Sequence, residues 1–127
     1  MSFRGEFEQA RDFLILHRSD YDYAYSHFKW PQLEEFNWVL DYFDLMAALN
    51  NHLALWIVDE NGVEQKVTFE EMSMRSNQVA NFLRKQGLKK GDSILLLLDN
   101  EMALWELMLG VMKIGVVLVF VSFLLSH

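Results

Sequence analysis

The sequence has 127 residues and a mass of 15.0 kDa, about the size of one domain. Hydrophobic residues make up 52% of it and aromatic residues 14%, so it can bury a core, and intrinsic disorder is excluded as its main state. The 11 basic and 18 acidic residues give a formal net charge of −7, which repels a phosphate backbone and argues against a nucleic acid partner, and the absence of cysteine excludes disulfides, thiolate metal sites and a cysteine nucleophile.

The N-terminal residues do not have the pattern of an export signal. Met1 to Asp12 alternate charged residues with phenylalanine and lack the uninterrupted apolar stretch of a signal peptide. We therefore expect a cytoplasmic protein.

The chain begins with an amphipathic pattern over residues 3–17, which predicts a helix. Its apolar residues fall at spacings of three to four: Phe3, Phe7, Ala10 and Leu14. A tyrosine-rich stretch follows, in which a short helix is expected to start at Asp20 and to be broken at Trp30-Pro31. We assign residues 1–31 to an N-terminal helical arm.

A further helix is predicted to begin at Asn37, whose side chain suits an N-cap. Asp41 lies just beyond this cap, and the helix is expected to run through about Leu49. Asn50-Asn51 then ends it.

Two β-prone runs, 53–59 and 63–69, flank Glu60-Asn61-Gly62. The pattern predicts a β-hairpin, because Asn-Gly supplies the positive φ angles of a tight turn.

The clearest helix signal covers residues 69–86. Thr68 is placed to cap the helix, Glu71 stands three residues on as in a capping box, and Gly87 ends it. One helical stripe is apolar or small: Phe69, Met72, Ser76, Val79 and Leu83.

The remaining residues predict a βαβ unit with a right-handed crossover. The runs 93–98 and 116–121 are apolar on both faces, as expected for strands inside a covered parallel sheet, and a helix is predicted between them over 101–114. The fold class is therefore α/β, with a hairpin, several helices and one parallel βαβ unit. Residues 32–121 form its α/β domain, and 122–127 a tail outside it.

Residues with catalytic or metal-binding potential do not form a site in the sequence. The four histidines show no metal-ligand spacing and are expected to be surface or capping residues: His17, His27, His52 and His127. Gly110 and Gly115 have the spacing of phosphate-loop glycines, but Val116-Val117 stand where Lys and Ser/Thr are needed. We predict no catalytic, cofactor-binding or metal-binding residue.

Three groups of charged residues receive structural interpretations. The pairs Glu34-Glu35 and Glu70-Glu71 are neighbours that point about 100° apart on a helix, which favours capping and helix-dipole roles. Asp41 and Asp44 share a helical face and are expected to be solvated. A basic cluster at a helix C-terminus suits the helix dipole better than an anion site: Arg84, Lys85, Lys89 and Lys90.

The stretch Leu107–Leu125 is near the length of a bilayer span and holds a single charge, Lys113. A membrane anchor is disfavoured, because Lys113 inside the span costs about 2.5–3.5 kcal/mol, Gly115 breaks the helix, and the β-branched residues from Val116 favour strand.

Taken in order, several motifs resemble the start of the AMP-forming acyl-CoA synthetases, in the acetyl- and medium-chain branch of the adenylate-forming superfamily. The resemblance covers roughly residues 8–119. Its motifs are Phe36-Asn37 opening a helix, Ala54-Leu55-Trp56-Ile57-Val58-Asp59 before the turn, Val67-Thr68-Phe69-Glu70-Glu71-Met72, Ser76-Asn77-Gln78-Val79-Ala80-Asn81-Phe82-Leu83, Gly87-Leu88-Lys89-Lys90-Gly91-Asp92 and Met112-Lys113-Ile114-Gly115-Val116-Val117.

The resemblance implies ATP-dependent activation of a carboxylic acid to an acyl-adenylate, then thioester formation with coenzyme A, as in fatty acid metabolism. In such enzymes ATP, Mg and CoA are bound by motifs that lie downstream of this segment, so the segment itself is expected to bind none of them and to be inactive. Phe120 stands where the family usually has proline, and 122–127 only faintly resembles the family's continuation. Both departures favour a truncated N-terminal segment.

Two other functions stay open: a small membrane-associated protein anchored by Leu107–Leu125, or a stand-alone interaction module that uses Trp30, Trp38 and the tyrosine-rich arm as anchors. The expected partners are the missing downstream domains, or a second copy held through an open sheet edge.

Overall fold

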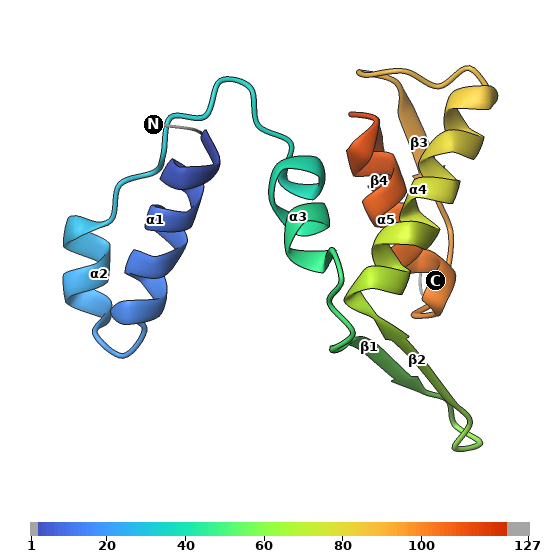
Figure 1. Ribbon diagram of the computed structural model, residues 1–127, viewed down its shortest axis with the longest axis horizontal. Coiled ribbons are helices and arrows are strands. Elements are labelled where there is room, and N and C mark those ends of the chain that lie inside the picture. Colours follow the sequence, from blue (N-terminus) through green and yellow to red (C-terminus); the bar gives the residue numbers. More distant parts are fainter. Residues whose placement is uncertain (1–2, 122–127) are drawn as a thin grey trace, which may run out of the picture. The chain divides into compact units, whose positions relative to one another are not determined.

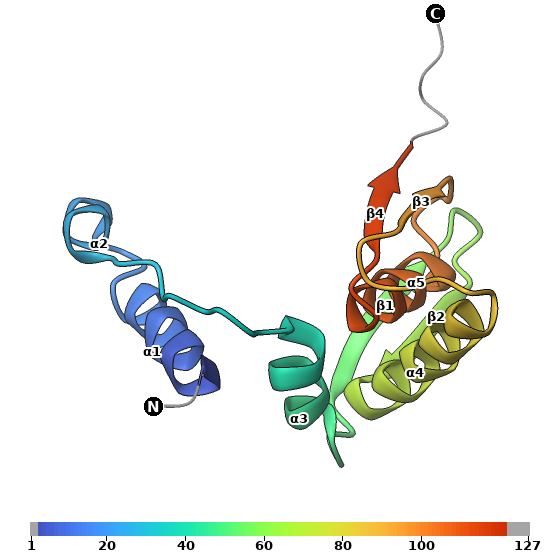
Figure 2. The ribbon, with the colours of Figure 1, turned by 90° about the horizontal axis from the view of Figure 1, so that it is seen from above.

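The computed structural model describes residues 3–121 and divides the chain into two compact units, the first extending to Phe36 and the second beginning at Asn37 (Figures 1 and 2). The sequence predicted a boundary after Pro31, between the N-terminal arm and the α/β domain. That boundary stays a prediction. The predicted tail, 122–127, lies outside the described residues.

The first unit contains two helices, α1 (Phe3–Leu16) and α2 (Tyr21–His27), which confirms both helices predicted there. Asp20 caps α2, since its Oδ1 accepts a hydrogen bond from the Tyr23 amide at 3.1 Å. Phe36 belongs to this unit, because its ring stacks on that of Phe7 with centroids 5.2 Å apart. Aromatic contacts take the place of a buried aliphatic core in this arm.

The second unit starts with the helix predicted at Asn37, but its geometry differs from the expectation. Trp38–Phe43 form a π-helical segment, η1, and Asp44–Ala47 a short α-helix, α3. The helix ends at Ala47 rather than near Leu49, because Ala48 leaves the helical conformation with a ψ of 122°, and Leu49 then adopts a left-handed φ of 56°. A π-helical segment is rare and lets the chain insert one extra residue in a turn.

The predicted hairpin is present as β1 (Leu53–Val58) and β2 (Glu64–Thr68), which pair antiparallel. The turn differs from the prediction that Asn61-Gly62 supplies two positive φ angles. Gly62 has a positive φ of 79°, and Asn61 does not. The Gly62 amide donates to the Asp59 carbonyl at 3.0 Å, and Asp59 Oδ1 accepts from the amides of Asn61 and Val63. The Asp59 side chain thus supports a longer turn that needs one left-handed residue.

Helix α4 (Phe69–Lys85) follows β2 directly, and its predicted capping box is confirmed. The Thr68 hydroxyl accepts from the Glu71 amide at 3.2 Å, and the Glu71 carboxylate accepts from the Thr68 amide at 2.9 Å. In Figure 1 the hairpin extends away from the start of this helix. Four residues of α4 are buried on one stripe: Met72, Ser76, Ala80 and Leu83.

The predicted βαβ unit is present as β3 (Ser93–Leu96), α5 (Met102–Lys113) and β4 (Val117–Phe120), and the two strands pair parallel with Ser93 opposite Val117. The sequence predicted that both faces of these strands are buried. For the described residues this prediction is wrong. Leu95 is 68% exposed and Val119 45%, because helices cover the other face only.

Two apolar clusters hold the second unit together where α4 packs against α5. The first joins η1 and α3 to the end of β2 and the start of α4: Val39, Phe43, Ala47, Val67 and Met72. The second joins α4 and α5 to the chain entering β4: Ala80, Leu83, Val111, Ile114 and Val116.

The capping box yields a stability prediction. Thr68→Ala should lower the free energy of unfolding by about 0.5–2 kcal/mol, because it removes the acceptor of an otherwise unpaired helix amide. Glu70→Ala is the control and should change it little, since Glu70 adds no cap. Chemical denaturation measures both, and equal effects would place the cap elsewhere.

The same box predicts a pH dependence. The hydrogen bond from the Thr68 backbone lowers the pKa of Glu71 below its usual 4.5. Burial opposes this shift, and the Thr68 hydroxyl and the Arg75 charge add weaker lowering effects. As the pH falls, Glu71 therefore binds its proton in the unfolded chain before it does so in the folded chain. The stabilisation by the ionised Glu71 carboxylate is fully present above the usual pKa and is lost as the pH falls through the lower pKa of the folded chain.

Glu71→Gln keeps an acceptor oxygen but has no proton to bind. We expect this variant to lose less stability than the wild-type chain when unfolding is compared at acid and neutral pH. An identical pH dependence of the two chains would contradict the shift.

Candidate functional site: a buried lysine between three helices

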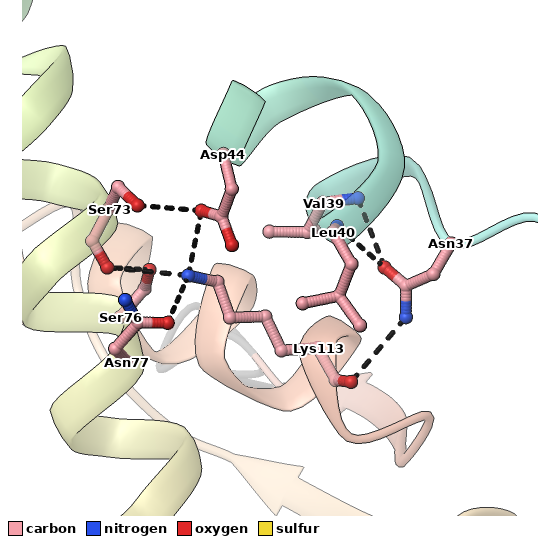
Figure 3. A network of polar contacts seen from close by, with 8 residues as sticks. All are labelled: Asn37, Val39, Leu40, Asp44, Ser73, Ser76, Asn77 and Lys113. Atoms are coloured by element: carbon pink, nitrogen blue, oxygen red, sulfur yellow. Dashed lines mark hydrogen bonds and ion pairs between the residues drawn. The ribbon is translucent and has the colours of Figure 1, made fainter. Parts of the chain in front are cut away.

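Lys113, the charge inside the apolar run 107–125, is buried near the end of α5 with a relative exposure of 4%. Its Nζ donates to Asp44 Oδ1 at 2.8 Å, to Asn77 Oδ1 at 2.7 Å and to the Ser73 carbonyl at 3.3 Å (Figure 3). An ammonium group has three N–H donors, and here each has an acceptor.

The acceptors come from two other helices, which fixes how those helices meet α5. Asp44 begins α3, and Ser73 and Asn77 lie one turn apart on α4. The Ser73 hydroxyl also donates to Asp44 Oδ1 at 2.7 Å, and the Ser76 hydroxyl donates to the Ser73 carbonyl at 2.8 Å. The site is therefore a closed network that links α3, α4 and α5.

Asn37 adds a second link beside this network (Figure 3). Its Oδ1 accepts from the amides of Val39 and Leu40 at 3.1 and 3.2 Å, and its Nδ2 donates to the Met112 carbonyl at 2.8 Å. One side chain thus caps the start of η1 and the end of α5, where both helices have unpaired backbone groups.

The interpretation of Asp41 and Asp44 as a solvated face was wrong. Asp44 pairs with buried Lys113, and its side chain is 22% exposed. Asp41 Oδ2 accepts from the Asn37 amide at 2.6 Å, which reinforces the cap. Both carboxylates are used inside the second unit.

The polar groups of this network are paired with one another and hold the three helices in place. Among the described residues no buried side-chain nitrogen or oxygen lacks a hydrogen-bond partner. Lys113 has no N–H left for a substrate, and Asp44 Oδ1 already accepts from two donors. A buried charge costs several kcal/mol unless it is paired and fully hydrogen-bonded, so this arrangement favours one relative placement of the three helices.

An apolar cavity of about 470 Å³ lies in the same unit. Its walls come from η1, the hairpin, α4 and α5, and carry no ionisable side chain: Trp38, Phe43, Ala54, Leu55, Phe69, Met72, Trp105, Met108, Leu109 and Met112. The cavity offers apolar contact and no group that could activate a ligand.

The other residues weighed from the sequence do not come together as a site. Within residues 3–121 no three His, Cys, Asp or Glu side chains are grouped to hold a metal ion. His17 and His27 contact the Tyr23 ring, His52 is exposed in the turn before β1, and His127 lies outside the described residues. All four members of the basic cluster are exposed.

Gly110 has a packing role rather than a phosphate-binding one. A Cβ on this residue would lie 2.5 Å from Val79 Cγ1 on α4, so glycine permits the close approach of α4 and α5. Gly115 has a left-handed φ of 69° at the end of α5.

Sequence reasoning missed the Lys113 network because its members are distant in the chain. A signal was present: an isolated lysine in a long apolar run needs a buried acceptor if the run is not a membrane span. Asp44, Ser73 and Asn77 could not be singled out as those acceptors without the packing of α3 on α4.

The comparisons with known proteins identify the family. The family model described as AMP-binding enzyme matches residues 46–127. The chain is 37% identical to 4-hydroxybutyrate–CoA ligase 1 of Metallosphaera sedula over 68% of its own length and 16% of the relative. It is 33% identical to the acetyl-coenzyme A synthetase of Bacillus subtilis over 77% of its own length and 19% of the relative.

The fold agrees with this family. The NpsA N-terminal subdomain from Klebsiella oxytoca superposes with a TM-score of 0.57 and 29% identity, covering 66% of this chain and 21% of that one. The chain belongs to the AMP-binding enzyme family, is similar in sequence to acyl-CoA synthetases of that family, and matches the NpsA N-terminal subdomain in fold. It spans less than a fifth of the length of these curated relatives.

The apolar run 107–125 is not one helix over its described part, since α5 ends at Lys113 and β4 begins at Val117. Across residues 3–121, every helix is too short or too polar to cross a membrane. Residues 122–125 lie outside the described range.

The network predicts a large effect of removing one partner. Asp44→Ala should lower the free energy of unfolding by about 3 kcal/mol or more, because Lys113 is left buried without its counter-charge. The double variant Asp44→Leu with Lys113→Met removes both charges and should recover most of this loss. Chemical denaturation of the wild-type chain and the two variants measures the loss and its recovery.

Arg75→Ala serves as the control. Arg75 pairs with Glu106 at 3.1 Å while its side chain is 43% exposed, and exposed pairs contribute about 0–1 kcal/mol. If Asp44→Ala cost no more than Arg75→Ala, the buried pair would not hold the helices.

Proposed function

We propose that this chain is an N-terminal scaffold segment of an AMP-forming acyl-CoA synthetase and that it does not itself activate a carboxylate. The reaction of the whole enzyme joins a carboxylate oxygen to the α-phosphorus of ATP, releases pyrophosphate, and then transfers the acyl group from AMP to the thiol of coenzyme A. The proposed setting is cytoplasmic fatty acid metabolism.

The closed Lys113 network carries this proposal. Adenylate formation needs donors aimed at phosphate oxygens and a positive charge beside the α-phosphate. In the second unit the one buried ammonium group among residues 37–121 is saturated by Asp44, Asn77 and the Ser73 carbonyl. Its N–H groups support the fold, not a nucleotide.

The described residues do not fit ATP, Mg or CoA. The basic cluster at the end of α4 is exposed, and no carboxylate cluster is grouped for a divalent ion between residues 3 and 121. We propose that these ligands are held by other parts of the whole enzyme, which are also the proposed partners of this segment.

A second candidate function follows from the first unit. Trp30 is 83% exposed, and Tyr21 and Tyr25 are 75% and 77% exposed. Tyrosine and tryptophan supply much of the binding energy at protein interfaces. In this alternative the arm binds a protein partner, and Trp30→Ala together with Tyr25→Ala abolishes capture of that partner without changing the unfolding of the chain.

The main proposal predicts no exchange of pyrophosphate into ATP by the purified chain with a carboxylic acid present. Exchange that follows the purified chain and exceeds a heat-killed control would contradict the proposal.

A chimera supplies the positive arm of this experiment. Residues 46–121 should replace the matching segment of the Bacillus subtilis acetyl-coenzyme A synthetase with exchange activity retained. A second chimera carries a longer graft, residues 37–121, which includes Asp44 and so the complete Lys113 network. It tests whether the complete network improves the folding of the chimera. A folded chimera without activity would show that the segment does more than scaffold.

A further inference from the structure

The apolar cavity of the second unit has no part in the scaffold role. Its volume is about 470 Å³, and its ten lining residues belong to η1, β1, α4 and α5. Eight of the ten are buried or half-buried, and the two exposed ones, Trp105 and Met112, lie on α5. The cavity is therefore enclosed mainly by residues of this unit and opens beside these two side chains.

Helix α5 has two apolar faces, and only one of them packs against α4. Gly110 lies against Val79 of α4, and Val111 belongs to the apolar cluster that joins these helices. The other face lines the cavity with residues spaced three and four apart, which places their side chains on one side of the helix: Trp105, Met108, Leu109 and Met112. The cavity thus occupies the space between this second face, η1 and the hairpin.

Hydrogen bonds outside the cavity hold its walls in place. Asn37 caps η1 and donates to the Met112 carbonyl at 2.8 Å, and Lys113 ties α5 to α3 and α4. At the mouth, Trp105 Nε1 donates to Asn100 Oδ1 at 3.1 Å, which fixes the orientation of this ring. A cavity with fixed walls binds a ligand without the cost of ordering the side chains that contact it.

The polarity of the walls favours an uncharged ligand. None of the ten residues has an ionisable side chain, and their only side-chain nitrogen or oxygen atoms are the two indole nitrogens of Trp38 and Trp105. A charged group would lose its hydration here without gaining a partner, which is costly. A buried water molecule needs about two to four polar partners, so an apolar ligand is also favoured over water.

The kinds of side chain in the walls favour an aromatic ligand. The lining residues include four aromatic rings and three thioethers: Trp38, Phe43, Phe69, Trp105, Met72, Met108 and Met112. Ring centroids are 5.7 Å apart between Trp38 and Phe43 and 6.2 Å apart between Phe43 and Phe69, so a ligand ring would extend an existing aromatic cluster. Methionine sulfur also makes favourable contacts with aromatic rings.

We propose that this cavity binds an uncharged aromatic molecule of about two fused rings. A dry apolar cavity of about 150 Å³ holds one benzene ring, so a volume of about 470 Å³ has room for two rings. The site is distinct from that of the carboxylate in the proposed function, because a carboxylate finds no cationic partner in these walls. A ligand that binds only the folded chain adds stability to the second unit.

Methionine methyl NMR tests the site with 2-naphthol, which is uncharged at neutral pH, as the probe. A ring in the cavity shifts the methyl resonances of Met72, Met108 and Met112 through its ring current. Met74 lies two residues from Met72 but is 53% exposed, so it reports non-specific binding. We expect saturable shifts at the three lining methionines and none at Met74. Equal shifts at Met74, or none at the lining methionines, would overturn the proposal.

Two further probes test the ligand class with the same resonances. 2-Naphthoate keeps the rings and adds a charge, and should bind about tenfold or more weakly than 2-naphthol. Decahydro-2-naphthol keeps the size and the hydroxyl without the aromatic rings, and should bind roughly two- to tenfold more weakly. If 2-naphthoate bound as tightly as 2-naphthol, the ligand would not need to be uncharged. If decahydro-2-naphthol did so, the aromatic class would be wrong.

Ala54→Leu tests the position of the site, because a larger side chain at residue 54 fills part of the cavity. Ala48→Leu is the matched control, since Ala48 is exposed after α3 and does not line the cavity. We expect the first variant to weaken 2-naphthol binding several-fold and the control to leave it unchanged. Met108→Phe fills the same space from α5 and replaces Ala54→Leu if that variant does not fold. A filled chain that binds as tightly as the wild-type chain would place the ligand elsewhere.

The chimera with residues 37–121 tests whether the cavity stays open within a whole enzyme. We expect the folded chimera to bind 2-naphthol with an affinity similar to that of the isolated chain, whether or not the chimera catalyses exchange. Loss of binding in the folded chimera would show that other parts of the enzyme fill the cavity, and it would overturn the proposal.

Discussion

The burial of one ammonium group is the constraint on which the second unit depends. Lys113 lies on α5 at 4% exposure, where an unpaired charge would be too costly to keep. Its acceptors are available only when α3 brings Asp44, and α4 brings Ser73 and Asn77, to the same point. Apolar clusters favour compaction of these helices without specifying their placement, and the directional bonds of Lys113 select one placement.

Local signals in the sequence were sufficient for most elements of the fold. The helix start at Asp20 and the caps at Asn37 and Thr68 were each predicted from residues close together in the sequence, because an N-cap depends on residues within a single turn. The family was identified from the order of its motifs.

Features set by packing at a distance could not be predicted in the same way. Asp44 was interpreted as solvated because its partner Lys113 is far along the chain. The π-helical segment η1 and the longer turn at Asp59 depend on backbone geometry that residue types do not specify. Phe120 was noted as a departure from the family's proline, but its place opposite Leu96 could be assigned only from the register of the sheet.

Amine labelling of the folded chain followed by mass spectrometry tests the central claim most directly. The account predicts that Lys113 stays unmodified in the native chain and reacts only on unfolding, while the exposed lysines react freely: Lys29, Lys66, Lys85, Lys89 and Lys90. Modification of Lys113 at the rate of the exposed lysines would contradict the account, because it would show that the ammonium group is open to solvent and does not hold α3, α4 and α5 together.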